Sequence, residues 1–423
     1  MRKSRSLRSP SCNWRSSKWF VYAIVVIALF AETFLYGFIV PILGYMITER
    51  LHIDPSQVQQ LTSTTLALHG FVSVVSGPII GHFADKIESR KIPLLFSLSG
   101  CITGTLMVAS THSIWIMLIG RVMQGIAESV VWIVGLATIT DVVDDSQTGM
   151  AMGMLMSFVN AGMLAGPLVS GFLLEAVGYR AMWAVPLSII AIDLVARLVM
   201  VEPPSKYKPE DNVEDIDLTL SQSQPLASNF YKVMLHDGRV ITILLVGTAS
   251  TIVSTSFHAT LPLYVHETFG WGPSTTGMLF ACLVLPILFM GPIAGRITDR
   301  VGVQVPASAS LVLQAGLLGL VGFVGNDRFP WASTQSGGKA VYMGSLVAIG
   351  ALRPFMSAIG PVELSAIVKE YQDRSPGIFG PRGGSSRVFS MVEVSACLGM
   401  MLGPIIGGVL KRLVGYTCMN LTF

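Results

Sequence analysis

Residues 162–171 read GMLAGPLVSG, and this stretch decides the fold because residues 399–408 repeat it as GMMLGPIIGG. A Gly-Tyr pair follows each copy, at 178–179 and at 415–416, so the offset of 237 residues is constant. In an apolar helix, glycines let a neighbouring helix approach closely, and a proline removes one backbone hydrogen bond and kinks the helix. The two copies therefore predict two related helices in two related halves of the chain.

A second repeat supports this division, because a Gly-Pro stretch followed by an aspartate and a proline occurs once in each half. Its members are GPIIG at 77–81 with Asp85 and Pro93, and GPIAG at 291–295 with Asp299 and Pro306. Arg121 and Arg353 also occupy corresponding places in the fourth helix of each half. Two homologous helical halves are typical of transporters, whose substrates bind near the membrane midplane where the halves meet.

The composition independently indicates a membrane protein. Of the 423 residues 52% are hydrophobic and only 13% are charged, against about 25% charged in soluble domains, which argues against a soluble multidomain enzyme. A helix needs about 20 apolar residues to cross a bilayer. Hydropathy predicts an all-α polytopic protein with eleven such helices, six in the first half and five in the second. They cover residues 19–47, 58–83, 92–111, 113–141, 149–174, 180–201, 239–265, 273–295, 304–325, 340–367 and 387–414.

The remaining segments predict the domain organisation. Residues 1–18 form a basic cytoplasmic tail, and the apolar stretch after them is too long for a signal peptide. An acidic, proline-containing linker at 202–238 joins the half at 19–201 to the half at 239–423. With a cytoplasmic N-terminus, 19 of the 28 Lys and Arg residues lie on the cytoplasmic side and six outside, as the positive-inside rule requires. The net charge of +3 comes from the tail and indicates no nucleic-acid partner, and the five cysteines show no metal or disulfide spacing.

Three motifs carry a resemblance to the major facilitator superfamily over about residues 19–416. GHFADKIESRK at 81–91 resembles its loop motif G-x-x-x-D-R/K-x-G-R-R/K, with Glu88 in place of the usual glycine. GRVMQG at 120–125 resembles the fourth-helix motif R-x-x-Q-G, and 162–171 resembles the fifth-helix antiporter motif with one serine substitution. Within the superfamily the chain is similar to vesicular amine transporters and to twelve-helix drug:proton antiporters of the fungal efflux type.

The resemblance implies roles for two groups of residues. The antiporter motif seals the closed state and accompanies antiport, whereas ordinary small-residue packing is the alternative; its residues are Gly162, Gly166, Pro167, Gly171, Gly399, Gly403, Pro404 and Gly408. An ionic latch at the cytoplasmic mouth is expected around the loop motif, with topological anchoring by positive charge as the alternative; its residues are Gly81, Asp85, Lys86, Arg90, Lys91, Asp141, Gly295 and Asp299.

Ionisable residues inside the spans are costly and therefore candidates for function. They are Glu32, Arg121, Glu128, Asp193, Arg197, Arg353, Glu363 and Glu393, with His69 and His258 as weaker candidates. Asp193 and Arg197 are four residues apart on one helix face, which favours a structural pair. We expect Glu32 and Glu393 to carry the proton and substrate coupling, assisted by Arg121, Glu128 and Arg353. A satisfied polar contact between helices is the alternative for the two glutamates.

These observations predict a secondary transporter that exports a small organic molecule, such as a drug, toxin or secondary metabolite, by proton antiport. No Walker loop, His/Cys metal cluster or nucleophile elbow occurs in the sequence, so the expected energy source is the proton gradient, without a cofactor and without enzymatic activity. The expected partners are a cationic or amphipathic small molecule and the lipid bilayer, and the expected form is a monomer. The plasma membrane is favoured, with a vacuolar or vesicular membrane as the alternative.

The length leaves two competing interpretations open. Two six-helix halves require twelve spans, whereas hydropathy predicts eleven, with the twelfth apparently missing after residues 415–416. A transport-inactive remnant or sensor is therefore one alternative. Proton-coupled nutrient uptake is the other, and the antiporter motif disfavours it.

Overall fold

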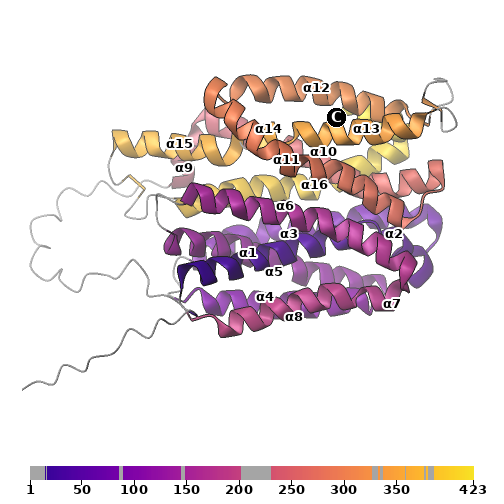
Figure 1. The fold of residues 1–423 in the computed structure, drawn as a ribbon, viewed down its shortest axis with the longest axis horizontal. Coiled ribbons are helices and arrows are strands. Elements are labelled where there is room, and N and C mark those ends of the chain that lie inside the picture. The colour runs from indigo at the N-terminus through magenta and orange to yellow at the C-terminus, as the bar shows by residue number, and fades with distance from the viewer. Residues whose placement is uncertain are drawn as a thin grey trace, which may run out of the picture.

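The computed structural model describes residues 15, 17–84, 89–143, 148–201, 230–325, 332–333, 337–357, 359–375, 378–379 and 385–423. This part of the chain consists of helices, turns and short connections (Figure 1). The elements are α1 (Lys18–Ile39), α2 (Leu43–Tyr45), the π-helix η2 (Met46–Arg50), α3 (Pro55–Ala84), α4 (Lys91–Ala109), α5 (Ile114–Val142), α6 (Thr148–Ala176), α7 (Gly178–Met182), α8 (Ala184–Val199), α9 (Phe230–His236), α10 (Gly238–Phe269), α11 (Pro273–Val301), α12 (Gln304–Phe323), α13 (Gly338–Leu352), α14 (Pro354–Ser357), α15 (Ile359–Arg374) and α16 (Ser385–Thr422).

The helices lie side by side in two groups, α1–α8 and α10–α16, which Figure 1 shows below and above each other. We call the end at which α1 begins the inner end and the opposite end the outer end. The backbone N–H of Val201 donates to the carbonyl oxygen of Arg15 (3.1 Å), so the first group starts and finishes at the inner end. The all-α fold in two helical halves that the repeats predict is confirmed.

Ten of the helical segments in the described residues are long and apolar enough to cross a membrane, not the predicted eleven. The exception is the span expected at 340–367, which is divided into α13, α14 and α15. Arg353 ends α13, and Pro354 follows it. Proline has no N–H to donate to the carbonyl four residues earlier, so the helix breaks at this point. The eleven-span prediction is therefore not confirmed.

The two halves share a hydrophobic core only at the outer end. One cluster contains side chains of both halves, among them Phe38 of α1, Leu174 of α6, Val265 of α10 and Leu279 of α11. The other clusters in the described residues belong to a single half; one joins α1, α5 and α6, and another joins α9, α10, α15 and α16. Because lipid is as apolar as these side chains, close packing rather than escape from water holds such helices together. The structure is therefore closed at its outer end.

The repeated glycines contact equivalent helices in the two halves. Gly166 of α6 lies against the backbone of α1, and Gly403 of α16 lies against the backbone of α10, so close that a Cβ would overlap it. Gly171 of α6 meets Pro273 of α11 in the same way, across the halves at the outer end. Gly408 of α16 meets α3 across the halves. The repeat thus places small residues at close contacts in four helix pairs, α6 with α1, α16 with α10, α6 with α11 and α16 with α3.

The Gly-Tyr pair after each repeat also has the same geometry in both halves. Gly178 has φ 79° and Gly415 has φ 81°, in the left-handed region that glycine adopts without a Cβ penalty. The turn directs the following tyrosine back onto its own half. Tyr179 Oη donates to the carbonyl oxygen of Ala109 (3.0 Å), and Tyr416 Oη lies 2.8 Å from Tyr342 Oη.

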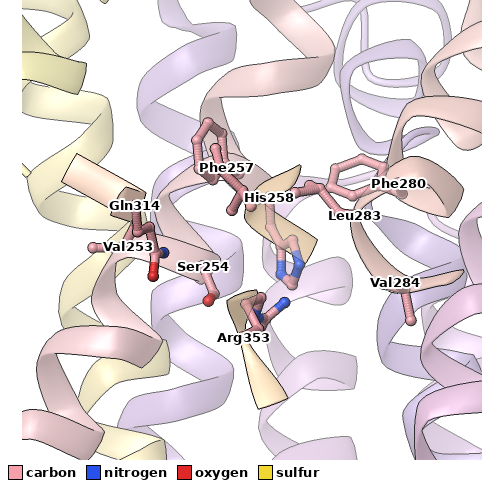
Figure 2. A pocket seen from close by; sticks show the side chains of 10 residues that line it. Val253, Ser254, Phe257, His258, Phe280, Leu283, Val284, Gln314 and Arg353 are labelled. Carbon is pink, nitrogen blue, oxygen red and sulfur yellow. The ribbon is translucent and has the colours of Figure 1, made fainter. Parts of the chain in front are cut away.

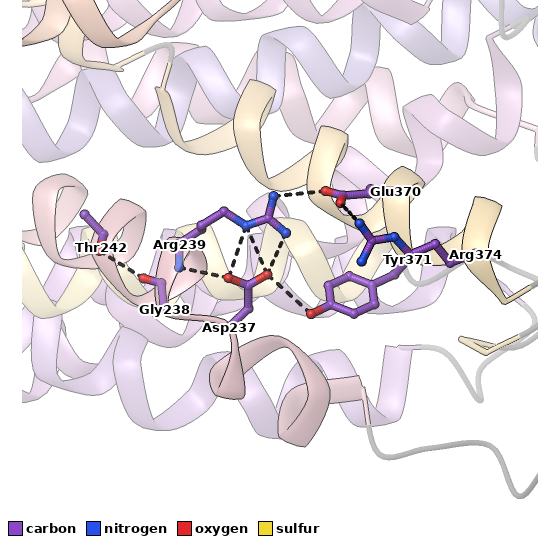
Figure 3. Close-up of polar contacts among 7 residues, drawn as sticks. All are labelled: Asp237, Gly238, Arg239, Thr242, Glu370, Tyr371 and Arg374. Atoms are coloured by element: carbon purple, nitrogen blue, oxygen red, sulfur yellow. Dashed lines mark hydrogen bonds and ion pairs between the residues drawn. The ribbon is translucent and has the colours of Figure 1, made fainter.

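An ion-pair network joins α10 to α15 at the inner end (Figure 3). Asp237 caps α10 by accepting from the backbone N–H of Arg239 (2.9 Å), and the Arg239 side chain donates to both Asp237 and Glu370. Tyr371 Oη also donates to Asp237, and Arg374 pairs with Glu370. The hydrogen-bonded Arg239 guanidinium holds the pKa of Asp237 below its usual range. The network fixes the start of α10 against the C-terminal end of α15.

We expect Asp237→Ala to lower the free energy of unfolding by about 1 kcal/mol, because α10 loses its N-cap. Asp237→Asn keeps an acceptor for the cap and should cost less. Because the folded-state pKa is depressed, the stabilisation by the carboxylate is present above about pH 4 and is lost as the pH falls through the folded value. Thermal unfolding of the detergent-purified protein between pH 3 and 6 measures both effects. A pH dependence that is the same in Asp237→Asn and the wild type would contradict this assignment.

Candidate functional site

Two buried carboxyl groups and one half-buried carboxyl group, from different helices, lie close together in the interior of the molecule. The side chains of Glu32 on α1 and Glu128 on α5 are 6% and 7% exposed, and Glu393 on α16 is half-buried. Glu128 lies near enough to both Glu32 and Glu393 for its charge to act on each. The structure therefore brings together three of the residues that the sequence analysis selected, two from the first half and one from the second.

Glu32 and Glu393 each have a cysteine as a hydrogen-bonding neighbour. Cys101 of α4 lies within hydrogen-bonding reach of Glu32, and Cys397 Sγ donates to Glu393 Oε1 (3.2 Å). A thiol is a weak, neutral donor, so it compensates little of the cost of a buried negative charge. Proton binding removes that cost, which makes these two carboxyls suitable proton carriers. No group of three or more His, Cys, Asp or Glu side chains in the described residues could hold a metal ion.

A chain of polar rings connects Glu128 to the other half of the molecule. Its carboxylate pairs with His69 Nε2 of α3, and the His69 ring lies 5.5 Å from the ring of Tyr36 on α1. Tyr36 Oη in turn lies 3.4 Å from Nδ1 of His258 on α10. Four helices thus contribute one polar side chain each to a path that crosses the interface. The sequence analysis gave the histidines little weight and did not predict this path.

Arg121 is almost completely buried in the first half, with 1% of its surface exposed. One Nη donates to Gln124 Oε1 (2.8 Å), and the guanidinium carbon lies 5.7 Å from the centre of the Tyr36 ring. Its Nε and second Nη have no hydrogen-bond partner. The charges of Glu32 and Glu128 both act on it, although Glu128 is hydrogen-bonded to His69. Arg121 therefore contributes positive charge beside the carboxyls without neutralising either of them.

Arg353 lies in a different environment, although its sequence position corresponds to that of Arg121. It lines a pocket of the second half together with His258, as Figure 2 shows. The other residues that line this pocket are Val253, Ser254, Phe257, Phe280, Leu283, Val284, Gln314 and Ile349. The two arginines therefore lie in separate parts of the interior. The contact between Tyr36, which is near Arg121, and His258, which lines the pocket of Arg353, connects these two parts.

Asp193 and Arg197 of α8 form the structural pair that their spacing predicts. Two hydrogen bonds of 2.9 and 2.6 Å join the guanidinium to the carboxylate, and both side chains are 1% exposed. Arg197 also donates to the carbonyl oxygen of Leu94, which fastens α8 to α4. The pair is satisfied within the first half, so we assign it to packing rather than to transport.

We expect Asp193→Ala to lower the free energy of unfolding by about 3 kcal/mol, because it leaves Arg197 buried without its counter-charge. Replacing both residues, by Asp193→Leu with Arg197→Met, should recover most of this stability. Thermal unfolding in detergent measures the first effect and the recovery. If the double variant folds normally but does not transport, the pair has a role beyond packing.

The residues expected to form the cytoplasmic latch lie at the inner end, where the structure describes only some of them. Lys91 Nζ donates to the carbonyl oxygens of Leu198 (3.1 Å) and Met200 (2.6 Å), so it caps the C-terminus of α8. Asp85 and Lys86, and the side chains of Asp141 and Asp299, lie outside the described residues. The latch stays a prediction. Of the remaining candidates, Glu363 is half-buried on α15, away from the carboxyl groups described above.

A two-half helical bundle with charged groups buried between its halves defines a membrane transporter. The chain belongs to the Major Facilitator Superfamily, whose family profile matches residues 25–380. It is 30% identical to the uncharacterized MFS-type transporter C18.02 of Schizosaccharomyces pombe, over 94% of this chain and 90% of that protein. It is 24% identical to the class E tetracycline resistance protein of Escherichia coli, over 73% of each chain. The human organic anion transporter MFSD10 has a similar fold, with a TM-score of 0.64 at 14% identity over 96% of both chains.

The family membership and the apolar helices establish a multi-pass membrane protein that acts as a transporter and is not an enzyme. Members of this family act on small molecules and draw on ion gradients rather than on a bound cofactor.

Proposed function

We propose that this chain exports a small organic molecule in exchange for protons, with Glu32 and Glu393 as the proton-carrying groups. The observation that carries the proposal is the group of three carboxyl side chains in the interior, in which the buried Glu128 lies close enough to act on both the buried Glu32 of its own half and the half-buried Glu393 of the other half. A charged carboxylate is costly there, so each group releases its proton only when the surroundings change. The relative that confers tetracycline resistance supports an efflux direction.

The packing between the halves supports alternating access. The shared core and the contacts of Gly171 and Gly408 close the outer end, whereas the inner ends of the halves have separate cores. We assign this arrangement to the inward-facing state, with the N-terminus in the cytoplasm. Protonation of Glu32 and Glu393 and substrate binding then favour different states. The path from Glu128 through His69 and Tyr36 to His258 crosses the interface that must rearrange.

Inside-out membrane vesicles with an acid interior test this function. Export coupled to protons predicts that a probe substrate accumulates inside vesicles that contain the protein, and that collapse of the pH gradient releases it. The probes are tetracycline and 3-phenyllactate, the organic acid chosen for the pocket described below. Proton-coupled uptake predicts accumulation in right-side-out vesicles in acid medium instead. No gradient-dependent flux of any probe in either orientation would favour the transport-inactive interpretation and overturn the proposal.

A further inference from the structure

The pocket of the second half lies between α10, α11, α12 and the end of α13 (Figure 2). Among the described residues that line it, Arg353 is the only one with a permanent charge, and none is acidic. Figure 2 shows Arg353 and His258 directed toward each other, with Ser254 and Gln314 on one side of them. Phe257, Phe280 and Leu283 provide the apolar wall. The pocket is therefore amphipathic and positively charged.

Arg353 has no ion pair and no side-chain hydrogen bond among the described residues. Its guanidinium is permanently protonated and offers five N–H donors in a planar fork. It ends α13 at the break before Pro354, where the backbone is irregular inside a span. Irregular backbone at membrane depth is tolerated where it lines a cavity. A cation held there without a counter-charge is costly, so a bound anion would stabilise it.

Gln314 supplies an independent sign of a ligand. The residue is 5% exposed and lines the pocket, and its acceptor Oε1 has no hydrogen-bond partner among the described residues. Ser254 Oγ donates to the carbonyl oxygen of Ser250 (2.9 Å), so toward the pocket it can only accept. Buried acceptors of this kind normally have a partner. A hydrogen-bond donor carried by a bound ligand would supply the missing partner.

From this geometry we infer that the pocket binds an amphipathic organic acid, whose carboxylate or equivalent anion pairs with Arg353. A hydroxyl or N–H group beside the anion donates to Gln314. Only the anion and this neighbouring group enter the pocket, because Phe257 and Phe280 are 3% and 2% exposed and offer little surface to the apolar body of the acid. The identification of this ligand as the cargo rests on the proposed export function. It replaces the sequence-based expectation of a cationic substrate, because the pocket offers no negative charge.

Binding of four matched probes to the purified full-length protein in detergent tests the inference. The probes are 3-phenyllactate, 3-phenylpropionate without the hydroxyl, neutral 3-phenyllactamide and cationic phenylalaninol, each also with indole in place of phenyl. We expect 3-phenyllactate or its indole analogue to bind most tightly. Arg353→Gln should weaken this binding at least about tenfold, because a buried ion pair loses one partner. Arg353→Lys keeps the charge but not the planar fork and should lie in between.

Two further variants make the result specific. Gln314→Leu should remove the preference for the hydroxy acid over 3-phenylpropionate, whereas Arg374→Gln, which changes an arginine that is 70% exposed on α15, should bind like the wild type. If Arg353→Gln does not fold, Arg353→Lys and Gln314→Leu carry the test. Equal binding of acid, amide and amine in both the phenyl and indole series, or failure of all eight probes to bind, would overturn the inference.

The binding measurement needs no gradient, so it fails separately from the proposed function. Arg353-dependent binding of the acids without proton-driven export would leave the ligand class standing and overturn the antiport mechanism. Proton-driven export of tetracycline together with no preference for acids would support the antiport mechanism and overturn the ligand class.

Discussion

Glu32→Gln and Glu393→Gln each reduce proton-driven export at least about a hundredfold, which is the scale of losing a proton-transfer group. Glutamine has nearly the volume of glutamate and can still accept from the neighbouring thiols of Cys101 and Cys397. It cannot take up or release a proton. The coupling step is therefore lost while the packing is retained. Accumulation of tetracycline and 3-phenyllactate in acid-loaded inside-out vesicles measures the loss.

A matched control separates a loss of coupling from a loss of folding. Glu363→Gln changes a half-buried carboxyl of α15 outside the cluster and should export like the wild type. Both cluster variants should also exchange labelled for unlabelled substrate across vesicles without a gradient, because that exchange requires no net proton movement. If both variants kept export and its pH dependence, the assignment of the proton carriers would be wrong.

Much of the fold was predictable because its determinants are local in sequence. A hydropathic span is a continuous run of apolar residues, and the two copies of the decapeptide at 162–171 and 399–408 expose the duplication directly. The break at Arg353 was not predicted, because averaged hydropathy does not record that Pro354 lacks a backbone donor. A proline alone would not have located the break, because Pro78, Pro167 and Pro404 lie inside continuous helices.

The site was predictable in its members more than in its connections. Charged residues inside apolar spans can be recognised from the sequence alone. Three of those selected, Glu32, Glu128 and Glu393, do lie close together in the structure. Their partners come from other helices, and no pattern within one helix reveals which helix lies opposite. The hydrogen bond of Glu128 with His69 joins residues 59 positions apart, and the contact of Tyr36 with His258 joins residues 222 positions apart.

The same limit explains why Arg121 and Arg353 differ. The duplication predicts equivalent backbone positions, and both residues do belong to corresponding spans. Their surroundings depend on side chains that the duplication does not preserve. Arg121 lies near two carboxylates of its own half, whereas Arg353 lines a pocket without any. A duplicated position therefore predicts a place in the fold but not a chemical role.

Gly171→Leu and Gly408→Leu hold the outer end open and reduce transport at least about tenfold. In the closed state Gly171 lies against the backbone of Pro273 and Ser274 on α11, and Gly408 lies against Ser63 on α3. A leucine side chain has no room at either contact, so closure would require the helix pairs to separate. Overpacking of this kind costs about 1–3 kcal/mol at each site. A transporter that cannot close one end cannot alternate.

Thiol labelling distinguishes an open outer end from simple misfolding. A cysteine introduced by Leu279→Cys, in the fully buried core at the outer end, should react slowly with a membrane-impermeant reagent in an otherwise cysteine-free chain. Adding Gly171→Leu or Gly408→Leu should make it react quickly. Gly316→Leu is the matched control, because an added side chain on that exposed face of α12 meets nothing within 4 Å. If the Gly171 and Gly408 variants labelled slowly and transported normally, these contacts would not be the closure. The halves would then have to seal through the surrounding apolar core alone.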